Sequence, residues 1–306
     1  MSTINLIRSD PQEPAEIRAT ADRPVVYRTR GRGHGPITRL MSPSDLGEQL
    51  KPFVFLDIFD ANMSEMTAAG VVHPHSGIAT VTVITEGDVH YDDPEAGQGY
   101  IEYGGVEWMR AGGGVWHGKE LSSGRSERVR GFQLWLALPS ELELAQVESQ
   151  YIEASAMHHV GPAHVIIGTH EGVTSPVKAP VGTTYLLVTL APGERWTYTP
   201  PADHTVGWLA LSHGSLVGTV TGSAGEMLVL AEGEDVVELV GGADGATFVL
   251  GSAIPHPHDL HLGYYSVHAT AEGLVTGERN IELLREKLEG LGDRRRASGA
   301  TPIYRG

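Results

Sequence analysis

The chain has 306 residues, of which 41% are hydrophobic and 20% charged, and its 38 acidic and 22 basic side chains give a formal net charge of −16. This acidic balance excludes a general nucleic-acid binder, which needs a basic face to displace counterions from phosphates, and it argues against attraction to anionic membranes. Because the chain has no cysteine, disulfides, thiolate metal sites and cysteine nucleophiles are excluded.

The first 24 residues are polar and contain several prolines, so they are interpreted as an N-terminal arm. They lack the apolar segment that a signal peptide needs. No later stretch of about 20 apolar residues is long enough to span a bilayer. We therefore expect a soluble, cytoplasmic protein.

From residue 25 onward, short β-branched or aromatic runs alternate with Gly, Pro, Asp and Asn, a pattern typical of β-sandwiches and barrels. The runs cover residues 53–58, 80–85, 131–138, 165–167, 185–190, 208–211, 227–230 and 247–251. Strand character lapses between Pro139 and Pro162. We therefore predict two β-barrel domains, 25–140 and 160–268, and a linker over 141–159 with one or two helical turns from Glu141 to Glu148.

A single clear helix is predicted over residues 278–289. Ile281, Leu284 and Leu288 recur at intervals of three and four residues, and Gly290 ends the pattern. Thr270 could cap an earlier start of the same helix. We expect residues 269–306 to form a C-terminal helix and tail, with the helix docked on the body of the fold.

The 15 histidines include a pattern typical of a metal site. His73 and His75 flank Pro74, and residues two apart in a strand project from the same face. Pro74 removes a backbone donor, which favours the start or the edge of a strand. A glycine-rich turn then leads to His117, on a later strand that can lie beside the first. Three imidazoles and a carboxylate with open positions suit a divalent first-row metal.

These segments resemble the two signature stretches of the pirin family. The first is His73-Pro74-His75 followed by Glu86-Gly87, and the second is VEWMRAG at residues 106–112 running to His117. In the same order, residues 52–57 resemble the family's opening strand and residues 131–135 the strand that closes its first domain. The resemblance implies an all-β bicupin, with two stacked antiparallel β-barrel (jelly-roll, cupin) domains and a C-terminal helix, and it implies a monomer.

In pirins, the N-terminal barrel holds one iron-like metal through three histidines and a glutamate two residues after the third histidine. The resemblance therefore implies that His73, His75 and His117 are metal ligands. Lys119 occupies the glutamate position, and a protonated ammonium cannot be a ligand. A one-residue bulge could turn Glu120 inward as the fourth ligand; the alternatives are a three-histidine site or no native metal. Iron is expected first, with manganese, nickel, cobalt, copper and zinc left open.

Two functions from different classes follow from this resemblance. The first is a metal-dependent dioxygenase similar to quercetin 2,3-dioxygenase, acting with dioxygen on a small aromatic or flavonol-like substrate. Glu120, or a neighbouring base, would accept the substrate's hydroxyl proton, and Lys119, if it points inward, would hold an anionic oxygen. The alternative is a metal-containing, redox-sensitive regulator that binds a transcription factor or a metabolic enzyme as its protein partner without turning over substrate.

Several other residues have open roles. Phe53, Phe55 and Asp57 are expected to share one strand face and are candidates for the substrate pocket. The cluster from His256 to His268 follows the last barrel strand, where a pH-sensitive loop is favoured over a second metal site. No Ser-His-Asp set at recognisable spacing and no Gly-x-Ser-x-Gly elbow is present, which argues against a hydrolase with a covalent nucleophile.

Overall fold

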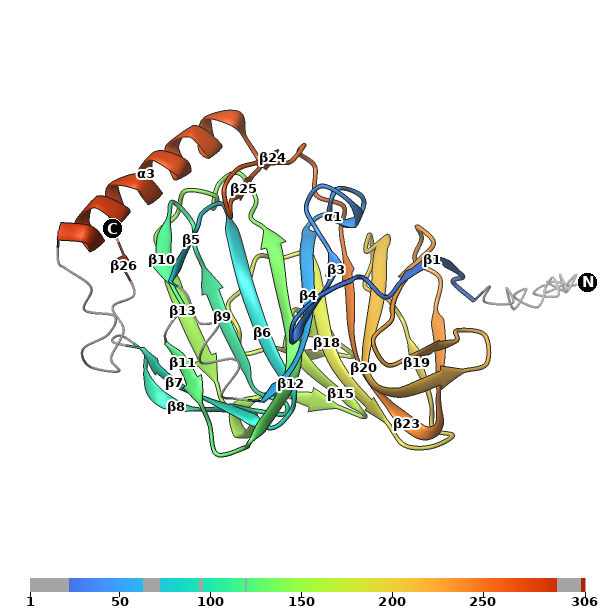
Figure 1. Ribbon diagram of the computed structural model, residues 1–306. Coiled ribbons are helices and arrows are strands. Elements are labelled where there is room, and N and C mark those ends of the chain that lie inside the picture. Colours follow the sequence, from blue (N-terminus) through green and yellow to red (C-terminus); the bar gives the residue numbers. More distant parts are fainter. Residues whose placement is uncertain (1–21, 63–71, 94–95, 119, 291–303, 306) are drawn as a thin grey trace, which may run out of the picture.

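The computed structural model describes residues 22–62, 72–93, 96–118, 120–290 and 304–305. Two antiparallel β-barrels stack side by side, and a C-terminal helix lies across one end of the first barrel (Figure 1). The predicted all-β class is confirmed, and each predicted β-branched run falls largely within a strand. No helix in the described part of the chain is long and apolar enough to cross a membrane.

The first barrel is built on a seven-stranded sheet and two three-stranded sheets. The large sheet has the order β13 (Glu148–Ile152), β9 (Val106–Arg110), β6 (Ile78–Glu86), β12 (Arg128–Ala137), β4 (Phe53–Asn62), β3 (Ile37–Met41) and β2 (Arg32–His34). One small sheet has the order β26 (Tyr304–Arg305), β10 (Val115–His117) and β5 (His73–His75). The other has the order β11 (Leu121–Ser123), β7 (Asp88–Asp93) and β8 (Gly97–Glu102). A short helix, α1 (Leu46–Leu50), precedes β4.

The second barrel is built on a nine-stranded sheet. Its main path is β1 (Val25–Thr29), β22 (Met227–Leu230), β20 (Val206–Val217), β23 (Val237–Ala253), β18 (Thr183–Leu190), β15 (Ala163–Ile167) and β14 (His159–Val160). Strands β19 (Arg195–Tyr198) and β21 (Gly222–Ser223) pair with β23 and β20. A separate hairpin joins β16 (Thr169–His170) and β17 (Val173–Thr174), and a 3₁₀ turn, η1 (Ala154–Ala156), follows β13.

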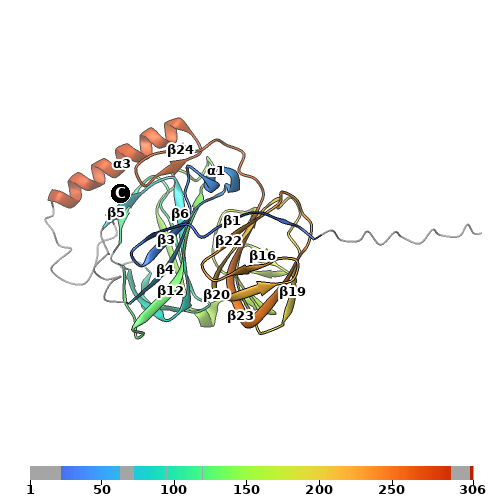
Figure 2. The same ribbon diagram turned by 45° about the vertical axis from the view of Figure 1, so that its right-hand side comes forward.

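Three segments differ from the predicted domain division. Strand β1, predicted for the first barrel, pairs with β22 in the sheet of the second (Figure 2). The predicted helical turns over 141–148 are reduced to hydrogen-bonded turns, of which one is closed by a bond from the N–H of Glu143 to the carbonyl of Pro139, and β13 then joins the first barrel. The hairpin of β24 (His261–Leu262) and β25 (Val267–His268) returns to the first barrel through a parallel bridge between Ser76 and Ser266.

The C-terminal helix, α3 (Ala271–Gly290), begins earlier than residue 278. Thr270 caps it, as its Oγ1 accepts a hydrogen bond of 2.9 Å from the backbone N–H of Gly273. The helix docks on the strand that carries His117: Trp116 Nε1 donates to the carbonyl of Ile281 at 2.9 Å. The expectation that this helix packs on the body of the fold is therefore confirmed.

Strand alternation gives the central sheet of the first barrel two buried faces. One face packs against the second barrel, where Phe53 meets Trp208 edge-on with ring centroids 5.3 Å apart. The other face points into the first barrel and carries Phe55 and Trp135. Between β12 and β4, Trp135 pairs with Phe55 but Leu136 pairs with Phe53, so a bulge at Val54 interrupts the alternation. Phe53 and Phe55 therefore lie in different cores.

Asp88, at the start of β7, anchors the segment that follows β11. Its carboxylate accepts hydrogen bonds from the backbone N–H groups of Arg125 and Ser126 and from the Arg125 guanidinium. Burial raises the pKa of Asp88, but these hydrogen bonds lower it more, to about 2 against an ordinary value of 3.8. Since the pKa is lower in the folded protein, the stabilisation is fully present above pH 3.8 and is lost as the pH falls through about 2.

We expect Asp88→Asn to lower the free energy of unfolding at pH 7 by about 1–3 kcal/mol, because a neutral amide replaces a carboxylate that accepts several hydrogen bonds. Urea unfolding of both proteins at stepped pH measures this difference. It should shrink as the pH falls below about 4. A difference that does not change with pH would contradict the assignment of the stabilisation to the ionised carboxylate.

Candidate metal centre

The register of two short strands brings the three predicted histidines together. Strand β5 pairs antiparallel with β10, so that His73 lies opposite His117 and His75 lies opposite Val115. Pro74 lies in β5, the outer strand of this sheet, which is the position where a strand tolerates a proline. One ring nitrogen from each of His73, His75 and His117 lies within 4.8 Å of the other two. The spacing of two residues in the sequence thus leads directly to this cluster.

In two of these rings one nitrogen is occupied by the protein and the other is left buried without a hydrogen-bond partner. His75 Nδ1 lies 3.0 Å from the carbonyl oxygen of Tyr265, to which it donates, and its Nε2 has no partner. His117 Nδ1 lies 2.5 Å from Glu120 Oε1, and its Nε2 likewise has none. Buried polar atoms in folded proteins are normally satisfied. These two lone nitrogens, beside a third imidazole, therefore fit a divalent metal ion.

The electrostatics of the two rings differ. Burial, together with the neighbouring His117 and His73, holds the pKa of His75 well below its ordinary value, so this ring is neutral, as a ligand must be. Burial also lowers the pKa of His117, but the adjacent Glu120 carboxylate outweighs it and the net pKa is raised. A metal at this site would therefore compete with a proton at His117.

Glu120 is almost fully buried and contacts His117, but it does not join the group that contains the other two histidines. Its Oε2 accepts a hydrogen bond of 2.9 Å from the backbone N–H of Gly118, and its Oε1 binds Nδ1 of His117. It forms a second possible cation group with His117 and Glu107 and is not part of the group with His73 and His75. Glu120 therefore orients His117 in this geometry. Lys119 lies outside the described residues.

Glu107 is a buried acid of the site that the sequence analysis did not single out. It lies on β9 opposite Thr82 of β6, and both side chains are buried. Burial, followed by repulsion from Glu120, raises the pKa of Glu107 to about 7. The sequence feature that could have identified Glu107 is its position as a lone carboxylate between the apolar residues Val106 and Trp108. Strand alternation places Glu107 on the opposite face of β9 from Trp108.

The predicted pocket residues do not remain together. Phe55 stacks on Trp135 with centroids 4.0 Å apart, and Trp135 meets the His75 ring edge-on at 4.8 Å. Asp57 pairs with Arg39, whose guanidinium carbon lies 3.7 Å from the centroid of Phe55. The expectation that Phe53 shares their face is wrong, because the bulge at Val54 turns it into the interface between the barrels.

The other histidines make no comparable cluster. Among the described residues, both groups of side chains able to hold a metal ion contain His117. The cluster from His256 to His268 is not one of them. Its members separate: His256 Nε2 lies 3.3 Å from the carbonyl of Leu138, whereas His268 is fully buried against Glu143.

Several known proteins have sequences similar to this chain. The sequence model described as Pirin matches residues 36–136. A pirin-like protein from Caulobacter vibrioides is 32% identical over 269 residues, which cover 83% of this chain and 95% of that protein. A Vibrio cholerae protein, provisionally named a quercetin 2,3-dioxygenase, is 28% identical over 234 residues, which cover 72% of this chain and 82% of that protein.

Solved structures show the same architecture. A quercetin 2,3-dioxygenase from Acinetobacter baumannii superimposes with a TM-score of 0.73 at 23% identity, covering 89% of this chain and 99% of that chain. The bacterial pirin YhhW from Escherichia coli, in complex with nickel(II), gives a TM-score of 0.54 at 18% identity, covering 76% and 98%. These two likenesses concern the fold. Because the match to the Caulobacter protein spans nearly all of that relative, this chain belongs to the pirin family.

Proposed function

We propose that this chain is a metal-dependent dioxygenase that acts on a small aromatic, flavonol-type substrate such as quercetin. The observation that carries the proposal is the pair of buried, unpartnered Nε2 atoms of His75 and His117 beside His73. The Vibrio relative, with its provisional name, supports the choice of substrate class.

In this proposal His73, His75 and His117 hold the metal. When bound, a divalent transition metal supplies a Lewis acid with open positions for oxygen ligands. Iron is the metal we propose first, and the nickel(II) complex of the Escherichia coli pirin makes nickel the next metal to test. The neutral form of His75, enforced by burial, suits either ion.

The surrounding side chains would bind and orient the substrate and accept its proton. Trp135 and Phe55 place two stacked aromatic rings beside His75, and flat aromatic molecules pack favourably against such surfaces. The substrate's hydroxyl proton needs an acceptor, and Glu120 as this base stays a prediction, because its two oxygens are bonded to His117 and to the N–H of Gly118. A role for Lys119 in holding an anionic oxygen stays a prediction.

The first test measures metal content. The purified chain should hold about one divalent transition metal, and His75→Ala and His117→Ala should lose it, because each removes a ligand. Glu120→Ala should still bind metal, but with affinity reduced about 10–100-fold, since only the hydrogen bond that orients His117 is lost. Elemental mass spectrometry and chelator competition measure both quantities.

The matched control is His213→Ala, which removes an exposed histidine of the second barrel and should leave metal content unchanged. Complete loss of metal in Glu120→Ala, equal to that in His117→Ala, would show instead that Glu120 is itself a ligand.

The second test measures turnover. Metal-loaded protein should consume dioxygen in the presence of quercetin, and His117→Ala should reduce the rate to that of free metal, because the metal is no longer held. An oxygen electrode and the loss of the flavonol absorbance band follow the reaction. Fully metal-loaded protein that oxidises neither flavonols nor catechols would contradict the dioxygenase.

A further inference from the structure

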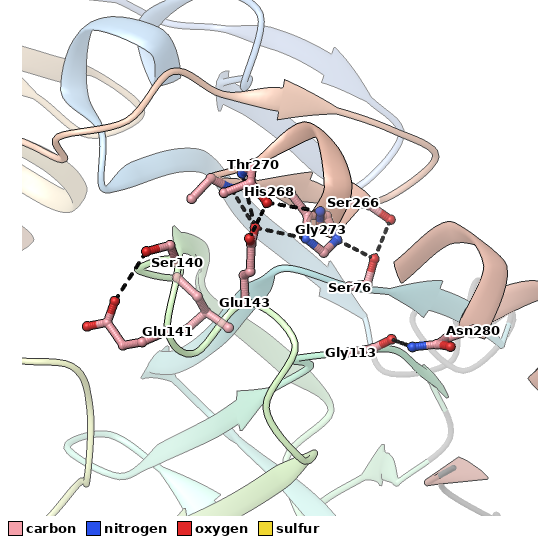
Figure 3. A network of polar contacts seen from close by, with 12 residues as sticks. Ser76, Gly113, Ser140, Glu141, Glu143, Ser266, His268, Thr270, Gly273 and Asn280 are labelled. Atoms are coloured by element: carbon pink, nitrogen blue, oxygen red, sulfur yellow. Dashed lines mark hydrogen bonds and ion pairs between the residues drawn. The ribbon is translucent and has the colours of Figure 1, made fainter. Parts of the chain in front are cut away.

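A buried hydrogen-bond network connects the C-terminal segment to the strand that carries His75 (Figure 3). Ser76 Oγ lies 2.9 Å from His268 Nε2, and His268 Nδ1 lies 3.1 Å from Glu143 Oε2. Ser76 and His268 are completely inaccessible to solvent, and Glu143 is only 3% exposed. The order of groups resembles a serine–histidine–carboxylate triad, but a buried serine cannot meet a substrate. The network must act within the protein.

Glu143 is the fixed end of this network. Its carboxylate also accepts hydrogen bonds from the backbone N–H groups of Ala269 (2.8 Å) and Thr270 (3.2 Å) and from Thr270 Oγ1 (2.5 Å). His268 therefore donates from Nδ1 to the Glu143 carboxylate, which can only accept, and its Nε2 contacts Ser76 Oγ. The same Thr270 caps α3, so the start of the helix and the network are held together.

The network reaches the metal centre through the turn between β24 and β25. Ser76 Oγ also lies 3.0 Å from Ser266 Oγ, and the backbone N–H of Val267 donates to the carbonyl of Ser76 at 3.2 Å. The residue before Ser266 is Tyr265, whose carbonyl accepts the hydrogen bond of His75 Nδ1. Ser76 is thus hydrogen-bonded to the turn between β24 and β25. The residue before it, His75, is the candidate ligand whose ring the same turn orients.

Tyr265 needs external support to stay where it is. Its φ of +58° is in the left-handed region, which is unfavourable for a residue with a side chain and persists only where surrounding contacts enforce it. On the helix side, Glu278 Oε1 accepts a hydrogen bond of 2.9 Å from the backbone N–H of Tyr264. The position of the Tyr265 carbonyl therefore depends on contacts with Ser76 and with α3.

Two glycines inside α3 make room for the network. A Cβ atom at Gly277 would lie 2.5 Å from both Ser76 Oγ and His268 Nε2, and one at Gly273 would lie 2.5 Å from the Glu143 carboxylate. The two glycines are four residues apart from each other and therefore lie on the same face of the helix. A glycine inside a helix is less favourable than alanine, and the close approach of the network accounts for both glycines here.

We propose that Ser76, His268 and Glu143 are positioning residues for the metal centre. They hold the turn at Tyr265 so that its carbonyl keeps the proton of His75 on Nδ1 and leaves Nε2 to the metal. The inference rests on the proposed metal site of the three histidines, but not on the identity of the substrate.

The test compares cobalt(II) and nickel(II) affinity, by chelator competition, in Ser76→Ala, Gly277→Ala and the wild type. Loss of a group that orients a metal-binding histidine weakens metal affinity about 10–100-fold, so we expect both variants to fall in this range. The visible spectrum of the cobalt(II) protein should also change, because the His75 ring is no longer fixed. Gly277→Ala is informative because helix propensity alone would make the variant more stable.

Two controls separate this role from a general loss of stability. Ser252 is a completely buried serine of the second barrel, 2.6 Å from Tyr198 Oη and 3.1 Å from His204 Nδ1. Ser252→Ala should lower thermal stability but leave metal affinity and the cobalt spectrum unchanged. Val275→Ala changes an exposed position of α3 and should alter neither.

Folded Ser76→Ala and Gly277→Ala proteins with wild-type metal affinity and spectrum would overturn the inference. If Ser76→Ala does not fold, Gly277→Ala decides alone. A wild type that binds neither ion would overturn the inference together with the metal site. A wild type that binds metal without oxidising flavonols would end the dioxygenase proposal alone, since the positioning role is measured by affinity and spectrum.

Discussion

The candidate metal centre depends on the hydrogen bonds that His75 and His117 make through Nδ1 to protein oxygens. An imidazole has two nitrogens, and the proton on one determines which nitrogen is available as a ligand. In this chain, Nδ1 of each ring faces a protein oxygen, from Tyr265 or from Glu120, and Nε2 is left buried without a partner. Two of the three candidate ligands are therefore oriented by contacts within the protein.

The two oxygens come from very different distances along the chain. Glu120 is three residues from His117, so this part of the centre is local. Tyr265 is 190 residues from His75, beyond the entire second barrel. The candidate metal site of the first barrel is thus completed by a segment that follows the second barrel in the chain.

The histidine cluster could be predicted from the sequence because it depends on short-range patterns. Two histidines lie on one strand face, and a glycine-rich turn leads the chain back to a strand that carries the third. It did not allow the supports to be predicted, because a carbonyl oxygen has no sequence signal and because Glu143 and His268 meet across 125 residues. The position of Phe53 failed for a different reason. One bulged residue moves the side chains beyond it to the opposite face of the strand, and no residue type near Val54 indicates a bulge there.

The same kind of backbone detail decides what Glu120 does. In a regular strand the residue two positions after His117 would share its face, and in the family that this chain resembles a glutamate stands there. Here Gly118 has a φ of +134°, a value that favours glycine, and the chain leaves the strand after His117. The carboxylate three positions on then reaches Nδ1 of His117 and the N–H of Gly118. With the acid one residue further along the chain, its partner is the imidazole of His117. In this geometry the carboxylate supports one candidate ligand, His117, and does not join the group of three histidines.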